Sequence, residues 1–395
     1  DGQLLITVPN KTAYFDPGHI QFFTKGRLAE LLDNQRFQLK CMEWERRRDK
    51  YSQHDMIKAL VGNRTADRAQ GRRICAVGAY GMRYNQLGFH WDGQARAFEA
   101  LGYTQRLLNV RRDTYENLRT KIIEYNPDIL WLGLKECLPL LIRLREDLKE
   151  IDCTTVYWFC DRTGIEGRTS ELPLKPPVLD HPEDVGEVLD FMFLSNAGQI
   201  PAYREAYGLD NVHYMPQACT PQFMHRVPGP QDYQIGFAGS LGEDVFHRAR
   251  TRLLRSVAGR YRTRLRDDVR NTIAEFYARC KIVLGAEVVG GSTEFHPELY
   301  TSNRFFVALG CGALYLCQWF PGIEELARNH RHLVWFKTRA ELLELIDYYL
   351  GHDAEREVIR RNAQELAHSK HTYVHRVQNM LDIIDGKTNQ FYGFL

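Results

Sequence analysis

The sequence lacks apolar runs long enough to cross a membrane, and its cysteines form no paired motif. The longest apolar runs, Ile129–Leu134 and Ala313–Cys317, are far shorter than the roughly 20 residues that a membrane helix needs. Leu4–Val8 is too short for a signal peptide and has no basic start. Nine scattered cysteines, none in a C-x-x-C pair, favour reduced thiols over a disulfide framework. We therefore expect a cytoplasmic protein without a membrane span.

The chain also has little net charge, only +2, but its charge is unevenly distributed. Nine arginines lie between His247 and Arg270, against Asp267 and Asp268. This stretch is either a solvated helix face or a face that meets an anion, such as a diphosphate or a polyanionic polymer.

The length of 395 residues suits two domains rather than one core. Apolar segments alternate with amphipathic helical patterns in both halves, which is typical of a parallel sheet covered by helices. The expected strands are 73–77, 105–110, 129–134, 154–159, 191–194, 212–215, 233–238, 281–284, 313–316 and 333–336. The expected helices are 92–101, 115–125, 138–151, 200–208, 246–258, 303–309, 323–327 and 339–350, with two more from Ala354. This pattern predicts an α/β protein of two Rossmann-like domains facing a cleft.

Breaker-rich and charged stretches mark the domain boundaries. The run P-Q-A-C-T-P-Q-F-M-H-R-V-P-G-P begins at Pro216 and indicates a hinge. The polar stretch before Arg73 indicates a linker with a short helix near Met56–Val61. We therefore expect an N-terminal extension at 1–45, a linker at 46–72, a first domain at 73–216, a hinge at 217–231, a second domain at 232–372, and a final helix at 373–395 that returns to the first domain.

The strongest chemical signal is the block Y-T-S-N-R-F-F-V-A-L-G-C-G, which starts at Tyr300. Thr301 or Ser302 can cap a helix that begins at Asn303, and Arg304 then lies in its first turn. Free backbone N–H groups beside a guanidinium form a suitable diphosphate site. The alternative is an ordinary helix with a surface arginine.

A second signal is Phe237–Gly242, where a strand enters a glycine-rich loop before a helix. Ligands of open α/β sheets bind at the carboxyl ends of the strands. Gly239 allows close approach of the backbone to a phosphate, and Ser240 can donate a hydrogen bond. Arg248 and Arg252 on the following helix could reach the same anion.

Three polar residues are candidates for a general base, which some group-transfer reactions need. His90 and Asp92 fall in the loop before the first helix, and Asp161 follows the strand V-Y-W-F-C. Asp92 could instead be the N-cap of that helix.

These motifs resemble those of the CgeB-like (spore maturation protein) family of GT-B glycosyltransferases, from about Arg73 to Leu381. The resemblance is carried by I-G-F-A-G-S-L, S-N-R-F-F-V-A-L-G-C-G-A-L, P-G-I-E-E-L, N-P-D-I-L-W-L-G, V-Y-W-F-C-D and H-T-Y-V-H-R. It implies a sugar nucleotide, a UDP- or GDP-sugar, held by the second domain and an acceptor held by the first. No metal is expected, because the D-x-D pattern of metal-dependent sugar transferases is absent and the histidines lack ligand spacing.

The sequence departs from this family at Val307. The family usually has a glutamate there, expected to bind the donor ribose, and valine cannot accept a hydrogen bond. Ribose recognition would then come from Glu324 or Glu325, or the donor differs, or activity is weakened.

The first 45 residues resemble the last part of a class I methyltransferase, in the strand ending V-P-N and the later F-F-T. The glycine-rich cofactor loop of such a domain is not in this sequence, so we expect no S-adenosylmethionine binding by this piece. The resemblance implies that the chain is one module of a larger protein.

Three functions follow from these observations. The leading one is a hexosyltransferase-like enzyme that moves a sugar to a hydroxyl of a glycan or another polymer. The second is glycosylation of modified DNA bases, as in some phage enzymes, for which the arginine-rich stretch is the support. The third is a GT-B-like binding domain without catalysis, for which Val307 is the support. The sequence does not choose between an inverting and a retaining reaction.

Overall fold

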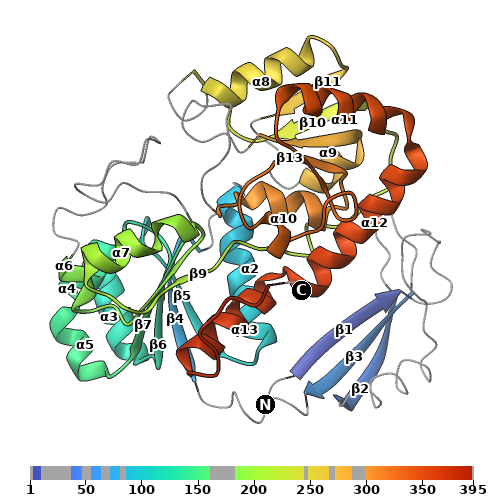
Figure 1. The fold of residues 1–395 in the computed structure, drawn as a ribbon. Helices are drawn as coiled ribbons and strands as arrows, with labels where there is room; N and C mark the ends of the chain where they lie inside the picture. The colour runs from blue at the N-terminus through green and yellow to red at the C-terminus, as the bar shows by residue number, and fades with distance from the viewer. Residues whose placement is uncertain are drawn as a thin grey trace. The chain divides into compact units, whose positions relative to one another are not determined.

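The computed structural model describes residues 3–9, 37–46, 55–63, 72–80, 86–160, 183–243, 248–266, 272–286 and 299–393 (Figure 1). The chain divides into two compact units. One comprises residues 1–72 and 100–104, and the other comprises residues 73–99 and 105–395. None of the helices among these residues is long and apolar enough to span a membrane.

The first unit contains a three-stranded antiparallel sheet in the order β1-β3-β2. Its strands are β1 (Gln3–Pro9), β2 (Phe37–Arg46) and β3 (Asp55–Asn63). The expected helix near Met56–Val61 is wrong, because this segment is the central strand and pairs along its length with both neighbours. Pairing on both sides satisfies its backbone hydrogen bonds, which a local sequence pattern cannot reveal.

The first half of the second unit is built on a six-stranded sheet in the order β5-β4-β6-β7-β8-β9. The pairs from β4 onwards are parallel. The strands are β4 (Arg73–Gly78), β5 (Thr104–Asn109), β6 (Ile129–Leu132), β7 (Thr154–Phe159), β8 (Phe191–Leu194) and β9 (Val212–Tyr214). All six expected strands of this half are therefore present.

Helices cover both faces of this sheet. One face packs in a single apolar core with α3 (Tyr115–Tyr125), α4 (Cys137–Arg143), α6 (Glu183–Gly186) and α7 (Ile200–Tyr207). The other face contacts α2 (Gln86–Ala100) through Phe98 on Trp131, and α13 (Tyr373–Ile384) through Tyr373 on Trp158. The expected single helix at 138–151 is two helices, because the chain breaks at Leu144 before α5 (Arg145–Ile151).

The second half is built on a five-stranded parallel sheet in the order β11-β10-β12-β13-β14. The strands are β10 (Tyr233–Ala238), β11 (Thr263–Arg266), β12 (Cys280–Gly285), β13 (Tyr315–Gln318) and β14 (Val334–Phe336). One face packs against α8 (Arg248–Ala258) and α11 (Arg339–Gly351). The other packs against α9 (Ile273–Ala278), α10 (Asn303–Gly310) and α12 (Asp353–Lys370).

Three features of this half differ from the expectation. β11 and α9 were not expected, and the helix expected at 323–327 is a short 3-10 turn, η3 (Ile323–Glu325). β11 reads T-R-L-R and lies at the sheet edge, so it lacks the apolar run of a central strand. The described part of the arginine-rich stretch, residues 248–266, is therefore a helix followed by a strand rather than one helix face.

The strand order of both sheets reverses direction at one place. In each sheet the first strand lies between the second and the third, at β4/β6 and at β10/β12. Ligands of open parallel sheets bind outside the carboxyl ends of the strands at such a switch point. A ligand site is therefore expected beside the residues that follow β4, β6, β10 and β12.

Candidate functional site

The structure brings together the two segments that the sequence singled out for phosphate binding. Arg304 is the second residue of α10, and its Nε donates a 2.7 Å hydrogen bond to the carbonyl oxygen of Ala238, at the end of β10. Its guanidinium also lies over the Phe237 ring, 4.5 Å from the centroid. A helix N-terminus, a guanidinium and the turn after β10 therefore meet beside the β10/β12 switch point.

Gly239 is required at this meeting point for two reasons. Its φ of 154° lies in a region that side-chain-bearing residues rarely adopt. A Cβ at this position would also collide with Nη2 of Arg304. The backbone N–H of Gly239 donates to the Arg266 carbonyl oxygen of β11 (2.8 Å), which fixes the turn. Close approach of backbone and guanidinium is thus built into the turn.

The start of α10 is well defined. Ser302 has the extended backbone of an N-cap, although its side chain makes no capping hydrogen bond. Thr301 is fully buried and precedes the cap, so the alternative that Thr301 caps the helix is wrong. Asn303 is the first helical residue, and its buried Oδ1 makes no hydrogen bond to any described residue. Arg304 lies in the first turn, as expected.

Arg250, rather than Arg248, is the arginine of α8 that reaches the glycine turn. Its Nη1 donates to the Ser240 carbonyl oxygen (3.2 Å) and its Nε donates to the Ala286 carbonyl oxygen (2.9 Å). It therefore bridges the segments that follow β10 and β12. Arg248 is exposed and donates to the Glu243 carbonyl oxygen (3.1 Å), so the structure does not bring it to Gly239.

Helical periodicity could have identified Arg250. It precedes the buried residues Leu254 and Val257 by four and seven positions, so it lies on the same face of α8. Arg248 and Arg252 lie on exposed positions of the helix. The apolar partners, not the number of arginines, indicate which guanidinium points inward.

Glu324 lies beyond the carboxyl end of β13, at the same sheet edge as Gly239. It is exposed, and it accepts a hydrogen bond from Nε1 of Trp319 (2.9 Å). Lys337 lies over the Trp319 ring, 4.8 Å from its centroid. Val307 is buried in the apolar core around α10, so it offers no polar group to a ligand.

The expectation that His90 lies in a loop is wrong. Helix α2 begins at Gln86, so His90 is in its second turn and only 4% exposed. Its Nε2 accepts a hydrogen bond from Gln94, and its Nδ1 is 3.1 Å from the Tyr373 hydroxyl. Burial lowers the pKa of His90 to about 3. The imidazole is therefore neutral and engaged on both nitrogens.

Trp91 and Gln94, which are neighbours of His90 in α2, pack at the switch point between β4 and β6 of the first sheet. The Trp91 ring lies so near Gly78 and Gly133 that a Cβ on either glycine would overlap it. Gln94 receives hydrogen bonds on Oε1 from Tyr80 (3.2 Å) and from the Trp131 indole (2.9 Å). These contacts dock helix α2 against the carboxyl ends of β4 and β6.

Of the two remaining candidates for the general base, the structure describes Asp92 but not Asp161. Asp92 is not the N-cap of α2, because it lies within the helix and pairs with Arg96 one turn later (2.6 Å). Both side chains of this pair are more than 40% exposed. Asp161 lies outside the described residues.

A metal site is not found among the described residues. Within the ranges given above, no three histidine, cysteine or acidic side chains gather as a metal site. The expectation of a metal-independent protein stays a prediction.

The last helices are held by a buried arginine. Arg376 is 1% exposed and donates to the carbonyl oxygens of Gln217 (3.2 Å) and Lys370 (3.3 Å). Its Nη2 also lies 2.7 Å from Nδ1 of His371, whose Nε2 bonds the Leu326 carbonyl oxygen (2.9 Å). The structure thus ties α13 to the segment that links the two halves.

Comparison with known proteins agrees with this architecture. Residues 241–382 match the family model described as glycosyl transferase-like. A comparison with curated protein sequences finds no significant match.

Three solved structures are similar over about four fifths of the chain. Anabaena Alr3699/HepE in complex with UDP and glucose has a TM-score of 0.55 at 12% identity, covering 80% of this chain and 100% of that one. Sucrose-phosphate synthase from Thermosynechococcus elongatus has a TM-score of 0.56 at 10% identity, covering 80% and 100%. An alpha-glucosyltransferase in complex with UDP and a 13-mer DNA has a TM-score of 0.57 at 10% identity, covering 79% and 99%. The chain therefore has the GT-B fold of glycosyltransferases, and its second half carries the glycosyl transferase-like match.

Proposed function

We propose that this protein transfers a sugar from a nucleoside diphosphate sugar to an acceptor hydroxyl. The observation that carries the proposal is the contact of Arg304 with the glycine turn after β10. It places a helix N-terminus and a guanidinium at a topological switch point, where a diphosphate would be neutralised. UDP in the similar HepE and alpha-glucosyltransferase structures supports the same ligand class here.

Each donor-site residue has a proposed role. Arg304 and Arg250 approach the glycine turn from two helices and would hold the diphosphate oxygens. Gly239 and Ser240 would bring the backbone close to the phosphates, and the start of α10 at Ser302 and Asn303 would add N–H donors. Because Val307 is buried, Glu324 is the proposed ribose acceptor.

The acceptor would bind at the first domain, and the identity of the general base that takes its proton stays a proposal. We infer that His90 positions helix α2 rather than taking a proton, because both of its ring nitrogens are engaged. Asp92 is exposed beside Arg96, and we keep it as the proposed base for the acceptor hydroxyl. Asp161 remains an alternative from the sequence.

A second candidate function is glycosylation of a base in DNA. The structure that carries UDP and a 13-mer DNA supports it, and so do the exposed arginines Arg248, Arg252 and Arg255 of α8. Binding to duplex DNA would weaken steeply with salt. Replacing Arg248 and Arg252 by glutamine would then reduce the salt slope by about two. No binding at moderate salt would reject this candidate.

Two finer assignments also stay proposals. The CgeB-like motifs support membership of that family, with a UDP- or GDP-sugar as donor. The methyltransferase resemblance of residues 1–45 likewise stays a proposal.

A thermal-shift series tests the proposed function. The full chain is heated with UDP, GDP, UMP and uridine, each at several concentrations. Ligand at one hundred times its dissociation constant stabilises a folded protein by about 2.7 kcal/mol, so one diphosphate should raise the melting temperature by several degrees. The nucleoside without phosphate should have little effect. Stabilisation by none of the nucleotides would favour the third possibility, a GT-B-like domain without catalysis.

A further inference from the structure

A cavity lies at the amino-terminal edge of the second sheet. Gln231 precedes β10 and Ala278 precedes β12, and both line a cavity of about 370 Å³. Because β10 and β12 are parallel, these residues mark the amino-terminal edge, whereas Gly239 marks the carboxyl edge. The remaining lining residues come from the hinge, with Arg226, and from α12, with Asp353, Arg356, Glu357 and Arg360.

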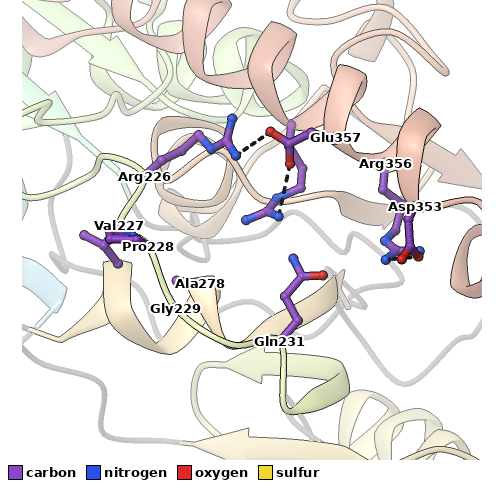
Figure 2. A pocket seen from close by; sticks show the side chains of 10 residues that line it. Arg226, Val227, Pro228, Gly229, Gln231, Ala278, Asp353, Arg356 and Glu357 are labelled. Carbon is purple, nitrogen blue, oxygen red and sulfur yellow. Dashed lines mark hydrogen bonds and ion pairs between the residues drawn. The ribbon is translucent and has the colours of Figure 1, made fainter. Parts of the chain in front are cut away.

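Arginine dominates the charge of this cavity. Three arginines line it against Asp353 and Glu357, which leaves one net positive charge. Glu357 is shared, because Arg226 contacts its Oε1 (2.5 Å) and Arg360 contacts its Oε2 (3.4 Å). Figure 2 shows Arg226 joined to Glu357 on one side of the cavity and Arg356 beside Asp353 on the other.

Arg356 is the most constrained of the three arginines. It is 3% exposed, its Nη1 donates to the Tyr349 carbonyl oxygen, and its Nη2 pairs with Asp353 (2.5 Å). Its Nε is buried and makes no hydrogen bond to any described residue. A buried guanidinium N–H without an acceptor is costly unless a ligand supplies one.

The carboxylates of the cavity are more exposed than two of its arginines, Arg356 and Arg360. The side chains of Asp353 and Glu357 are 76% and 46% exposed, against 3% for Arg356 and 11% for Arg360. Arg360 is fixed by donating to the Gly312 carbonyl oxygen (2.9 Å). The carboxylates can therefore move into solvent while the guanidinium groups of Arg356 and Arg360 stay in place.

The amino end of α12 adds to the positive potential. Asp353 and Arg356 belong to its first turn, and His352 at the N-cap makes no side-chain capping bond. Backbone N–H groups at a helix start attract anions. We propose that this cavity binds a small phosphorylated metabolite, whose phosphate group contacts Arg226 and Arg360 and displaces Glu357, while Arg356 binds another polar group of the same ligand.

The size and the place of the cavity define its ligand further. A volume of about 370 Å³ exceeds that of a phosphate ion and lies in the range of small-molecule sites. The site does not require the proposed donor site, because it occupies the other edge of the sheet. It does contact the segment that follows α10: Arg360 donates to the Gly312 carbonyl oxygen, two residues beyond the end of the helix whose first turn contains Arg304.

Calorimetry on the full chain tests this proposal. Inorganic phosphate and glucose 6-phosphate are titrated separately in phosphate-free buffer, with saturating UDP present to fill the donor site. Saturable binding is expected for both probes. R226Q should weaken it about tenfold, and E357Q should tighten it about threefold because a competing carboxylate is removed. R119Q, which changes an exposed paired arginine of α3, is the control and should not change it.

The arms of the experiment give distinct results. If glucose 6-phosphate binds more tightly than inorganic phosphate, the ligand is a metabolite that also contacts the rest of the cavity. If the two probes bind equally, the phosphate group alone is recognised. Binding that R226Q and E357Q leave unchanged would overturn the proposal, as would no saturable binding. R304Q should weaken UDP binding at least about thirtyfold and leave phosphate binding intact, so failure of the donor site and failure of this cavity are separable.

Discussion

The imidazole of His90 in α2 and the hydroxyl of Tyr373 in α13 lie 3.1 Å apart, although 283 residues separate them in the chain. The Tyr373 ring also packs on Trp158, with centroids 5.9 Å apart. The last helix thereby packs on the sheet of the first half, next to the switch point that Trp91 covers. This junction is structural in character.

His90 should make stability depend on pH. Its pKa is about 3 in the folded protein, against 6.5 for an ordinary histidine. Between these values the unfolded chain binds a proton that the folded chain excludes, so the free energy of unfolding falls as the pH drops below about 6.5. The slope from this group is up to about 1.4 kcal/mol per pH unit. Urea unfolding of wild type and H90Q at pH 7, 6 and 5 measures it, and equal slopes would contradict the burial of His90.

Gly239 should tolerate no side chain. Alanine there would adopt an unfavourable φ and collide with Arg304, so G239A should displace the guanidinium and weaken UDP binding at least about tenfold. G351A is the matched control, because nothing lies within 4 Å of an added Cβ at the end of α11. Calorimetry with UDP measures both variants. Normal affinity in G239A would show that the turn does not contact the donor.

Glutamate at position 307 should not restore a ribose contact. Val307 is 6% exposed within the apolar core, so V307E would bury a carboxylate and lower the free energy of unfolding by about 3 kcal/mol. V307I, which keeps the position apolar, should cost far less. Urea unfolding and UDP calorimetry are the measurements. A stable V307E with higher UDP affinity would mean that this side chain faces the donor.

Arg376 should be essential for the linkage of the two halves. Its guanidinium bonds two carbonyl oxygens and His371 while almost fully buried, and burial lowers its pKa to about 10. Lysine cannot reproduce this fork of donors, so R376K should lower the free energy of unfolding by about 2–3 kcal/mol. The exposed control R119K should change it by less than about 1 kcal/mol. Similar losses in chemical denaturation would refute the role of Arg376.

Local patterns correctly predicted the helix from Asn303 and the strand that precedes Gly239. The helix from Asn303 was marked by its cap, its periodic apolar residues and the glycines at its end, all within a dozen residues. The strand Tyr233–Ala238 and its glycine turn were equally local. That Arg304 then meets Gly239 follows from the parallel sheet, which places both segments at one edge.

The features that the sequence did not predict depend on distant partners. β3 is a strand because β1 and β2 pair with it on both sides. Helix α2 begins at Gln86 and therefore includes His90. The imidazole of His90 contacts Tyr373, which lies near the other end of the chain. Arg250 differs from Arg248 only in which face of α8 it occupies, and that face is set by packing on β10 and β12.

The most direct test of the central claim is UDP calorimetry with R304Q and R279Q. Arg279 is an exposed arginine at the amino-terminal edge of the same sheet, paired with Asp232 (2.5 Å), and so is matched in charge but not in place. R304Q should weaken UDP binding at least about thirtyfold, which corresponds to about 2 kcal/mol, and R279Q should leave it unchanged. Unchanged affinity in R304Q, or equal losses in both variants, would contradict a donor site at the start of α10.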